Sequence, residues 1–143
     1  MKLLRLERSL WDVTAVIVGG NNDECCPLTD FLADVGTQYP GSASGMFDLF
    51  ARFSVSGKDT FNDDLCHLVN RDEKIWQFTK GRIRVLWFYG SGNRIVVCSH
   101  GFIKQSQKTP GKEIKRVIAT KKQYESAEKV NAVTILEEEE DDH

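Results

Sequence analysis

Three short segments rich in β-branched and aromatic residues follow one another closely in the second half of this 143-residue sequence. They span 75–80, 82–89 and 94–99, and the last two are separated by Gly90-Ser91-Gly92-Asn93. Runs of this kind, bounded by glycine and polar residues, are typical of strands joined by hairpin turns. We therefore predict three antiparallel strands, with the middle one in a central position.

A strand and an amphipathic helix are predicted near the start of the chain. Residues 13–18 are apolar and β-branched and are followed by a Gly-Gly-Asn-Asn sequence, a pattern typical of a strand that leads into a loop. Apolar residues then recur at helical spacing from Leu28 to Val35. Pro27 suits the first turn of this helix, and Gly36 lies just beyond its end.

Two further helices complete the expected element order. One is capped by Ser42 or Ser44, ends at Gly57 with a left-handed cap, and is followed by a polar linker over 58–64. Its apolar stripe consists of Met46, Phe47, Phe50 and Phe53. The other follows the strands, with Thr109-Pro110 as its cap and first position.

This order indicates one α+β domain with antiparallel strands and helices gathered outside them. The chain is long enough for one hydrophobic core but short for two full domains. We assign residues 1–10 to an N-terminal extension, 11–130 to the folded domain and 131–143 to an acidic tail. Six consecutive acids at 137–142 repel one another, so the tail is predicted to be disordered.

The net charge of −2 conceals a strong segregation of charge along the sequence. Residues 74–122 contain 12 Lys and Arg against the single acid Glu113, a net charge of +11. Residues 1–73 have a net charge of −6, and residues 123–143 have −7. So one-sided a segment favours a polyanionic partner such as RNA. A basic face that merely balances the acidic part of its own molecule is the alternative.

The four cysteines show no framework of spaced disulfide pairs, because Cys25 and Cys26 are adjacent and the other two stand alone. Cys98 and His100 would lie on one face of a strand, but no second ligand pair has zinc-site spacing. We predict reduced thiols, no metal and no cofactor. No apolar run is long enough to cross a bilayer, and the charged N-terminus does not resemble a signal peptide, so we expect a cytoplasmic protein.

The basic segment contains a candidate anion-binding site. Arg82 and Arg84 alternate with apolar residues, which would place their guanidinium groups on one strand face about 7 Å apart. The following polar loop presents Lys104 and Lys108 beside the N-terminus of a helix, where anions are favoured. The wider set of residues expected to contact RNA is Lys80, Arg82, Gln107, Lys112, Lys115 and Arg116.

Several motifs in this region resemble the phage-derived branch of the HigB-like toxins, within the RelE superfamily. They are Ile75-Trp76-Gln77-Phe78, Arg84-Val85-Leu86-Trp87-Phe88-Tyr89, His100-Gly101-Phe102-Ile103-Lys104, Gln107-Lys108-Thr109-Pro110 and Glu113-Ile114. The resemblance covers roughly residues 11–124. Its glycine-phenylalanine-x-lysine and glutamine-lysine-threonine-proline elements are the most specific parts.

This resemblance implies a strand-helix-helix-strands-helix fold similar to that of microbial ribonucleases. It implies metal-independent cleavage of messenger RNA, often on the ribosome, and a helix-turn-helix antitoxin as partner. A ribose 2′-hydroxyl would attack the adjacent phosphate, so the protein must move protons and neutralise growing negative charge. Arg84 matches the family's strand arginine and would stabilise the transition state, while Lys104 and Lys108 match the loop lysines and would bind phosphate, with one of them available as a base.

His100 is a further catalytic candidate, because an ordinary histidine pKa near 6.5 suits proton transfer. A histidine at a strand end is also often a structural hydrogen-bond donor. Where many relatives have Glu and Arg, this sequence has Gln77 and Thr79, although Lys80 offers a cation one residue later. A catalytically weakened RNA- or ribosome-binding module and a structural phage accessory protein are therefore alternatives. Trp76, Trp87 and Phe88 have rings that stack on bases, but their apolar neighbours favour core packing.

Overall fold

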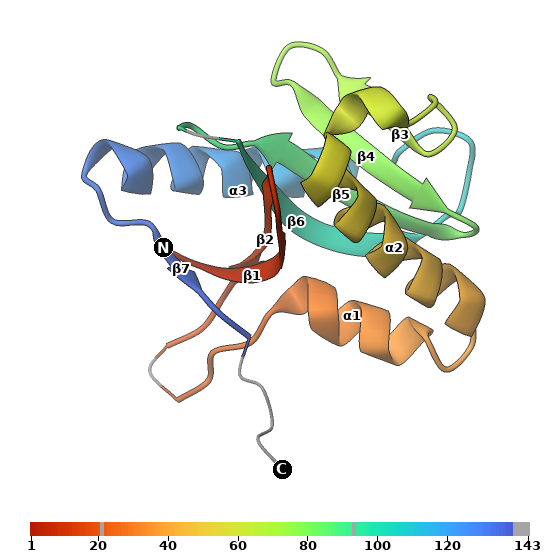
Figure 1. The fold of residues 1–143 in the computed structure, drawn as a ribbon, viewed down its shortest axis with the longest axis horizontal. Coiled ribbons are helices and arrows are strands. Elements are labelled where there is room, and N and C mark those ends of the chain that lie inside the picture. Colours follow the sequence, from red (N-terminus) through yellow and green to blue (C-terminus); the bar gives the residue numbers. More distant parts are fainter. Residues whose placement is uncertain (21, 93, 139–143) are drawn as a thin grey trace.

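The computed structural model describes residues 1–20, 22–92 and 94–138. Within them, a seven-stranded sheet lies between α1 and α2 on one face and α3 on the other (Figure 1). The elements are β1 Lys2–Arg8, β2 Asp12–Ile17, α1 Pro27–Val35, α2 Pro40–Ser56, the 3-10 turn η1 Lys58–Thr60, β3 Cys66–Asn70, β4 Ile75–Lys80, β5 Ile83–Tyr89, β6 Ile95–Ile103, α3 Gly111–Lys129 and β7 Thr134–Leu136.

The strands are arranged in the order β3-β4-β5-β6-β2-β1-β7. β3 to β6 form an antiparallel meander with β5 in its interior, which confirms the three predicted strands and the central position of the middle one. β2 pairs with β6 in parallel, and β7 pairs with β1 in parallel, so the complete sheet is mixed. The predicted α+β class with antiparallel strands is therefore correct, and the parallel pairs at β2–β6 and β1–β7 are additional to it.

The two faces of the sheet carry separate hydrophobic cores. The side under α1 and α2 is rich in aromatic residues, with Phe50, Phe53, Phe78 and Trp87 fully buried and in ring contact. The side under α3 is smaller and is built on Leu86, Phe88, Val117 and Tyr124. Each fully buried side chain of this size contributes about 1.5–3 kcal/mol. Of the stripe predicted on α2, only Phe47 is largely exposed, at 42%.

The N-terminal segment forms part of the sheet, which corrects the assignment of residues 1–10 as an extension. β1 pairs along its length with β2, and Leu3 is fully buried under α3. The predicted disordered tail is also wrong at its start, because Thr134–Leu136 forms β7 on the outer side of β1. Leu3, Leu4 and Leu6 are interspersed with charged residues, so in sequence this segment resembles an exposed, charged terminus rather than a strand. Residues 139–143 of the tail lie outside the described part of the chain.

Three helix and loop boundaries differ from the prediction. α2 begins at Pro40, a turn earlier than a Ser42 or Ser44 cap would place it, because proline suits a first helical position. The expected polar linker contains η1, and β3 follows it as an unpredicted edge strand. α3 begins at Gly111 without a side-chain cap, because the Thr109 hydroxyl is hydrogen-bonded elsewhere. Gly57 does end α2 with a positive φ, of 74°.

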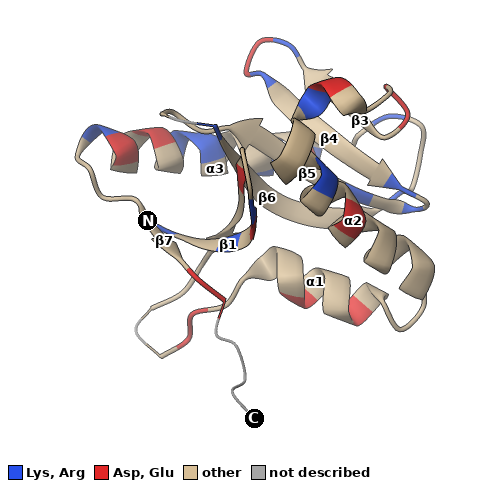
Figure 2. Ribbon diagram, in the orientation of Figure 1, with Lys and Arg blue, Asp and Glu red and all other residues tan. Residues whose placement is uncertain are grey.

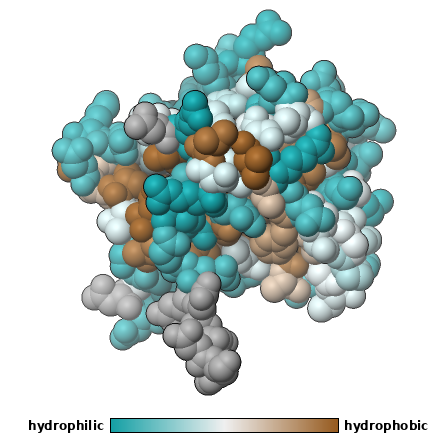
Figure 3. Space-filling view, in the orientation of Figure 1, coloured by the Kyte–Doolittle hydropathy of each residue, from teal (hydrophilic) through white to brown (hydrophobic). Residues whose placement is uncertain are grey.

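The surface, the helices and the cysteines each bear on function. On the face shown in Figure 3, hydrophobic residues occur in separate patches between hydrophilic ones. No helix in the described ranges has both the length and the apolar character needed to cross a bilayer. All four cysteines are free in the structure.

Candidate functional site

Four of the residues singled out from the sequence, Arg84, Lys104, Gln107 and Lys108, meet at one end of the sheet, where the β4–β5 turn faces the loop between β6 and α3. Thr79, Arg84 and Phe102 are direct cross-strand neighbours, so their side chains share the α3 face. Lys and Arg are visible near this turn in Figure 2. A small polar hollow here is lined by Gln77, Arg84, Phe102, Lys104, Gln105, Ser106, Gln107, Lys108, Thr109 and Pro110.

Arg84 is held in place by the backbone of its own turn. Its Nη1 donates hydrogen bonds to the carbonyl oxygens of Gly81 at 2.7 Å and Ile83 at 3.1 Å. Partial burial lowers the pKa of Arg84, and the nearby Arg82 lowers it further. A guanidinium starts from so high a pKa that it stays charged. Arg84 is therefore an oriented cation whose remaining donors can bind an anion.

Arg82 and Lys104 connect the turn to the loop. The Lys104 amide donates to the Arg82 carbonyl at 2.8 Å, and Arg82 Nη2 donates to the Lys104 carbonyl at 3.1 Å. Arg82 lies in the turn between β4 and β5. The sequence analysis put the guanidinium groups of Arg82 and Arg84 on one strand face in an anion-binding site. In the structure, Arg82 instead positions the start of the loop that carries Lys104.

The loop is fixed at its other end by Gln77 and Thr79. Thr109 Oγ1 donates to Gln77 Oε1 at 2.7 Å, and Gln77 Nε2 donates to Thr79 Oγ1 at 3.2 Å. Gln77 is only 4% exposed, so both ends of its amide are satisfied inside the protein. Gln77 and Thr79 thus hold the loop against β4, which is a structural role that a Glu or Arg would not fill in the same way.

A β-bulge at Ser99 determines where His100 points. Leu86 pairs with His100 and Trp87 pairs with Cys98, so Ser99 is an extra residue in β6. The bulge breaks the alternation of side chains. Cys98 therefore lies in the core under α1 and α2, while His100 faces α3. The prediction that both lie on one face is wrong for this reason. In addition, β6 extends to Ile103, so His100 is not at a strand end.

His100 is buried in a polar network beneath α3. It is 2% exposed, with Nε2 3.2 Å from Glu113 Oε1 and Nδ1 2.9 Å from Ser99 Oγ. Burial lowers its pKa to about 4, and repulsion from Arg116 adds to this effect while Glu113 opposes it. His100 does not line the hollow. Its surroundings favour the structural alternative over the catalytic one.

We expect His100 to make the protein less stable in mild acid. Because its pKa is lower in the folded chain than in the unfolded one, stability is fully present above about pH 6.5 and is lost as the pH falls towards 4. This residue should lower the free energy of unfolding by about 2 kcal/mol between pH 7 and pH 5. Urea denaturation of the wild type and His100→Gln at both pH values measures it. Equal losses in the two proteins would contradict this assignment.

The other cations predicted to contact RNA divide between different surfaces. Lys80 lies along Gly45 of α2, where a Cβ on that glycine would come within 2.5 Å of the lysine side chain. Lys80 is thus on the opposite face of the sheet from Arg84 and cannot supply a cation to the hollow. Lys112, Lys115 and Arg116 are exposed on α3, the helix that begins beside the hollow.

The composition of the hollow limits its chemistry. Its lining contains two lysines and one arginine next to the N-terminus of α3, a combination that favours an anion. Among its described lining residues there is no carboxylate and no imidazole. The closed part of the hollow measures about 10 Å³, so a phosphate would bind at its mouth unless the loop opened. Over the described ranges, no three His, Cys, Asp or Glu side chains are placed to hold a metal ion.

Sequence reasoning missed the residues that shape this site. Phe102, Gln105, Ser106, Thr109 and Pro110 line it in addition to the predicted cations. Phe102 was contained in the glycine-phenylalanine-x-lysine motif. Its cross-strand pairing with Arg84 places it at the hollow. The glycine of the same motif has a packing role, because a Cβ on Gly101 would come within 2.6 Å of the Phe31 ring.

The fold and the site define an α+β protein with a cationic surface hollow. A family model described as "Phage derived protein Gp49-like (DUF891)" matches residues 56–122. That segment runs from the end of α2 into α3 and contains all residues of the hollow. The match supports the phage-derived, toxin-like part of the resemblance and contains nothing specific to HigB. A comparison with curated proteins finds no match.

Proposed function

We propose that this protein is an RNA-cleaving toxin of the RelE/HigB type. The observation that carries the proposal is the convergence of Arg84, Lys104 and Lys108 on one hollow beside the N-terminus of α3. The similarity of residues 56–122 to a phage-derived family supports it, and so does the net charge of +11 over residues 74–122. The RelE-like assignment of the fold belongs to this proposal.

The chemistry follows from the charge at the mouth of the hollow. Attack of a ribose 2′-oxygen on the adjacent phosphorus builds negative charge on the phosphoryl oxygens and breaks the bond to the 5′-oxygen. Arg84 is oriented by its turn and would neutralise that charge, while Lys104 and Lys108 would hold the phosphate. The proton of the 2′-hydroxyl goes to a base, and the leaving 5′-oxygen takes a proton from water. A loop lysine is the proposed base, because His100 is buried away from the hollow.

A second function, RNA or ribosome binding without cleavage, is favoured by the absence of a carboxylate or imidazole from the described lining. The ends of the RNA product separate the two functions. The purified protein should convert a messenger RNA, alone or on ribosomes, into fragments with a 2′,3′-cyclic phosphate and a 5′-hydroxyl. RNA that is bound but stays intact under both conditions would exclude the endoribonuclease and leave the binding module.

The proposal includes a helix-turn-helix antitoxin that covers the basic hollow, in a cytoplasmic setting to which the four free cysteines are suited. Such a partner would place acidic or bulky groups over Arg84 and Lys104 or distort the loop between β6 and α3. Co-expression with the neighbouring reading frame, followed by affinity purification of this chain, should recover both proteins. Failure of the neighbour both to co-purify and to relieve growth arrest would remove the antitoxin from the proposal.

A further inference from the structure

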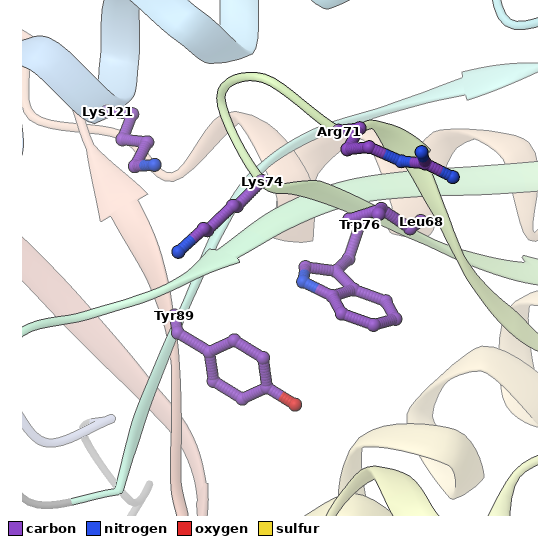
Figure 4. Close-up of a pocket in the computed structure, with 6 residues that line it drawn as sticks. All are labelled: Leu68, Arg71, Lys74, Trp76, Tyr89 and Lys121. Atoms are coloured by element: carbon purple, nitrogen blue, oxygen red, sulfur yellow. The ribbon is translucent and has the colours of Figure 1, made fainter.

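A second cavity lies at the opposite end of β4 and β5 from the hollow. It has a volume of about 380 Å³ and is lined by Leu68, Arg71, Lys74, Trp76, Tyr89 and Lys121. These residues come from β3, the β3–β4 turn, β4, β5 and α3, and Figure 4 shows their side chains around the opening. Tyr89 lies five positions after Arg84 along β5, which corresponds to about 17 Å of strand.

The apolar part of the cavity is aromatic and firmly supported. Trp76 is half-buried, and its ring stacks on the buried ring of Trp87 with a centroid distance of 5.6 Å and an angle of 19°. Tyr89 meets Trp76 edge-on at 6.0 Å. Burial raises the pKa of Tyr89 to about 12, so its phenol is a neutral donor at physiological pH. Lys58 Nζ lies over the Trp76 ring, 5.2 Å from its centroid, so a flat ligand that stacks on Trp76 would displace this lysine and could accept a hydrogen bond from Tyr89.

The rim of the cavity is cationic. Arg71, Lys74 and Lys121 supply three positive charges, and no described lining residue is acidic. Lys121 is held at the rim because its Nζ donates to the Glu73 backbone carbonyl. Lys74 projects from a turn in which its φ is 55°. An aromatic surface beside several cations suits a flat ring that carries an anionic group.

We propose that this cavity binds one nucleotide unit of a single-stranded RNA, with the base against Trp76 and Tyr89 and the phosphate against Lys74, Arg71 and Lys121. The choice of RNA rests on the proposed function, and the cavity adds to it a second contact point at the far end of β5. Stacking of a base on an aromatic side chain is largely independent of sequence. The cavity would therefore anchor RNA without selecting the cleavage sequence.

The test uses the full chain and an adenosine decamer with 2′-O-methyl groups, which cannot be cleaved by 2′-hydroxyl attack. Affinity is measured by fluorescence anisotropy at about 50 mM salt, where phosphate contacts are strong. Trp76→Leu should weaken binding about 5- to 100-fold, the loss expected for one stacked base. Lys74→Asn removes the charge and keeps a residue that accepts positive φ, and it should reduce the salt slope by about one.

Two control variants lie outside the cavity. Lys122→Ala removes the exposed lysine next to Lys121 on α3, and Phe47→Leu alters an exposed aromatic side chain of α2 that does not line the cavity. Both should bind the decamer within a factor of two of the wild type, a spread of roughly 0.4 kcal/mol. Unchanged affinity in both Trp76→Leu and Lys74→Asn would overturn the inference. Adenosine monophosphate that binds as tightly as the decamer would overturn RNA as the source of the nucleotide.

Failure of this inference is distinguishable from failure of the proposed function. If Trp76→Leu weakens binding of the decamer but no messenger RNA is cleaved, the nucleotide site is supported and the endoribonuclease activity is rejected. If messenger RNA is cleaved while Trp76→Leu and Lys74→Asn bind the decamer like the wild type, the nucleotide site is rejected and the endoribonuclease activity is supported.

Discussion

Replacing Arg84 by alanine is expected to slow RNA cleavage by about 100- to 1,000-fold, the usual cost of losing one donor to a developing oxyanion. Growth arrest on expression should be relieved accordingly. Arg84 is the one cation of the hollow whose guanidinium is fixed by two backbone carbonyls, so its loss removes oriented charge. Lys104→Ala and Lys108→Ala should weaken cleavage as well, with part of the loss in RNA affinity.

The matched control for Arg84→Ala is Lys80→Ala. Lys80 belongs to the same basic segment and the same hairpin, but it packs across Gly45 on the other face of the sheet. Its removal should leave cleavage unchanged within a factor of about three, because a charge on the other side of the sheet contributes little through solvent. Circular dichroism should show that both variants are folded. Equal activity of soluble Arg84→Ala and Lys80→Ala would refute the site.

Deleting residues 1–10 is expected to leave no cooperatively folded protein. The deletion removes β1 from between β2 and β7 and takes Leu3 out of the core beneath α3. Leu3→Ala alone should lower the free energy of unfolding by about 2–5 kcal/mol, as for other fully buried leucines. Since whole domains are stable by only about 5–15 kcal/mol, the loss of the complete strand exceeds what the fold can tolerate. Urea denaturation followed by fluorescence measures both effects.

Truncation of the acidic C-terminal residues is the control for deletion of residues 1–10. A version that ends at Leu136 keeps β7 and loses the ion pair between Glu137 and Arg5, while Arg5 keeps its two hydrogen bonds to Asp12. Glu137 is largely exposed, so this truncation should change stability by no more than about 1 kcal/mol. A sharp unfolding transition in the protein lacking residues 1–10 would show that β1 is dispensable and would contradict its place in the core.

Local patterns were sufficient for the elements whose periodicity is strong. The three hairpin strands, the helix after Pro27 and the apolar stripe around Phe50 follow from spacing alone. β7 could not be predicted in this way, because it becomes a strand only by pairing with β1, more than a hundred residues away in the sequence. β1 pairs with the nearby β2, but its charged residues made it resemble an exposed terminus. β3 is an edge strand with one neighbour, so its sequence carries little of the apolar alternation that identifies interior strands.

The candidate site was predicted in part for similar reasons. Arg84, Lys104 and Lys108 were recognised from charge and resemblance, and the structure places all three at one hollow. Lys80 and His100 were misplaced, because one residue of register decides the face of a strand and a bulge reverses that rule. The cavity beside Trp76 brings together residues of three strands, one turn and one helix, and no linear motif reveals such an arrangement.

The pairing of β7 with β1 has a consequence for synthesis of the chain. Lys2 pairs with Thr134, and the amino group of Met1 donates to the Ala132 carbonyl, so the sheet is completed only after residues 132–136 have been synthesised. At about 5–20 residues per second, β1 has an unpaired outer edge for roughly 10 s in every round of translation. Its sequence, KLLRLER, carries three cations and one acid. Such charges discourage the edge-to-edge association of nascent chains that a bare apolar strand would invite.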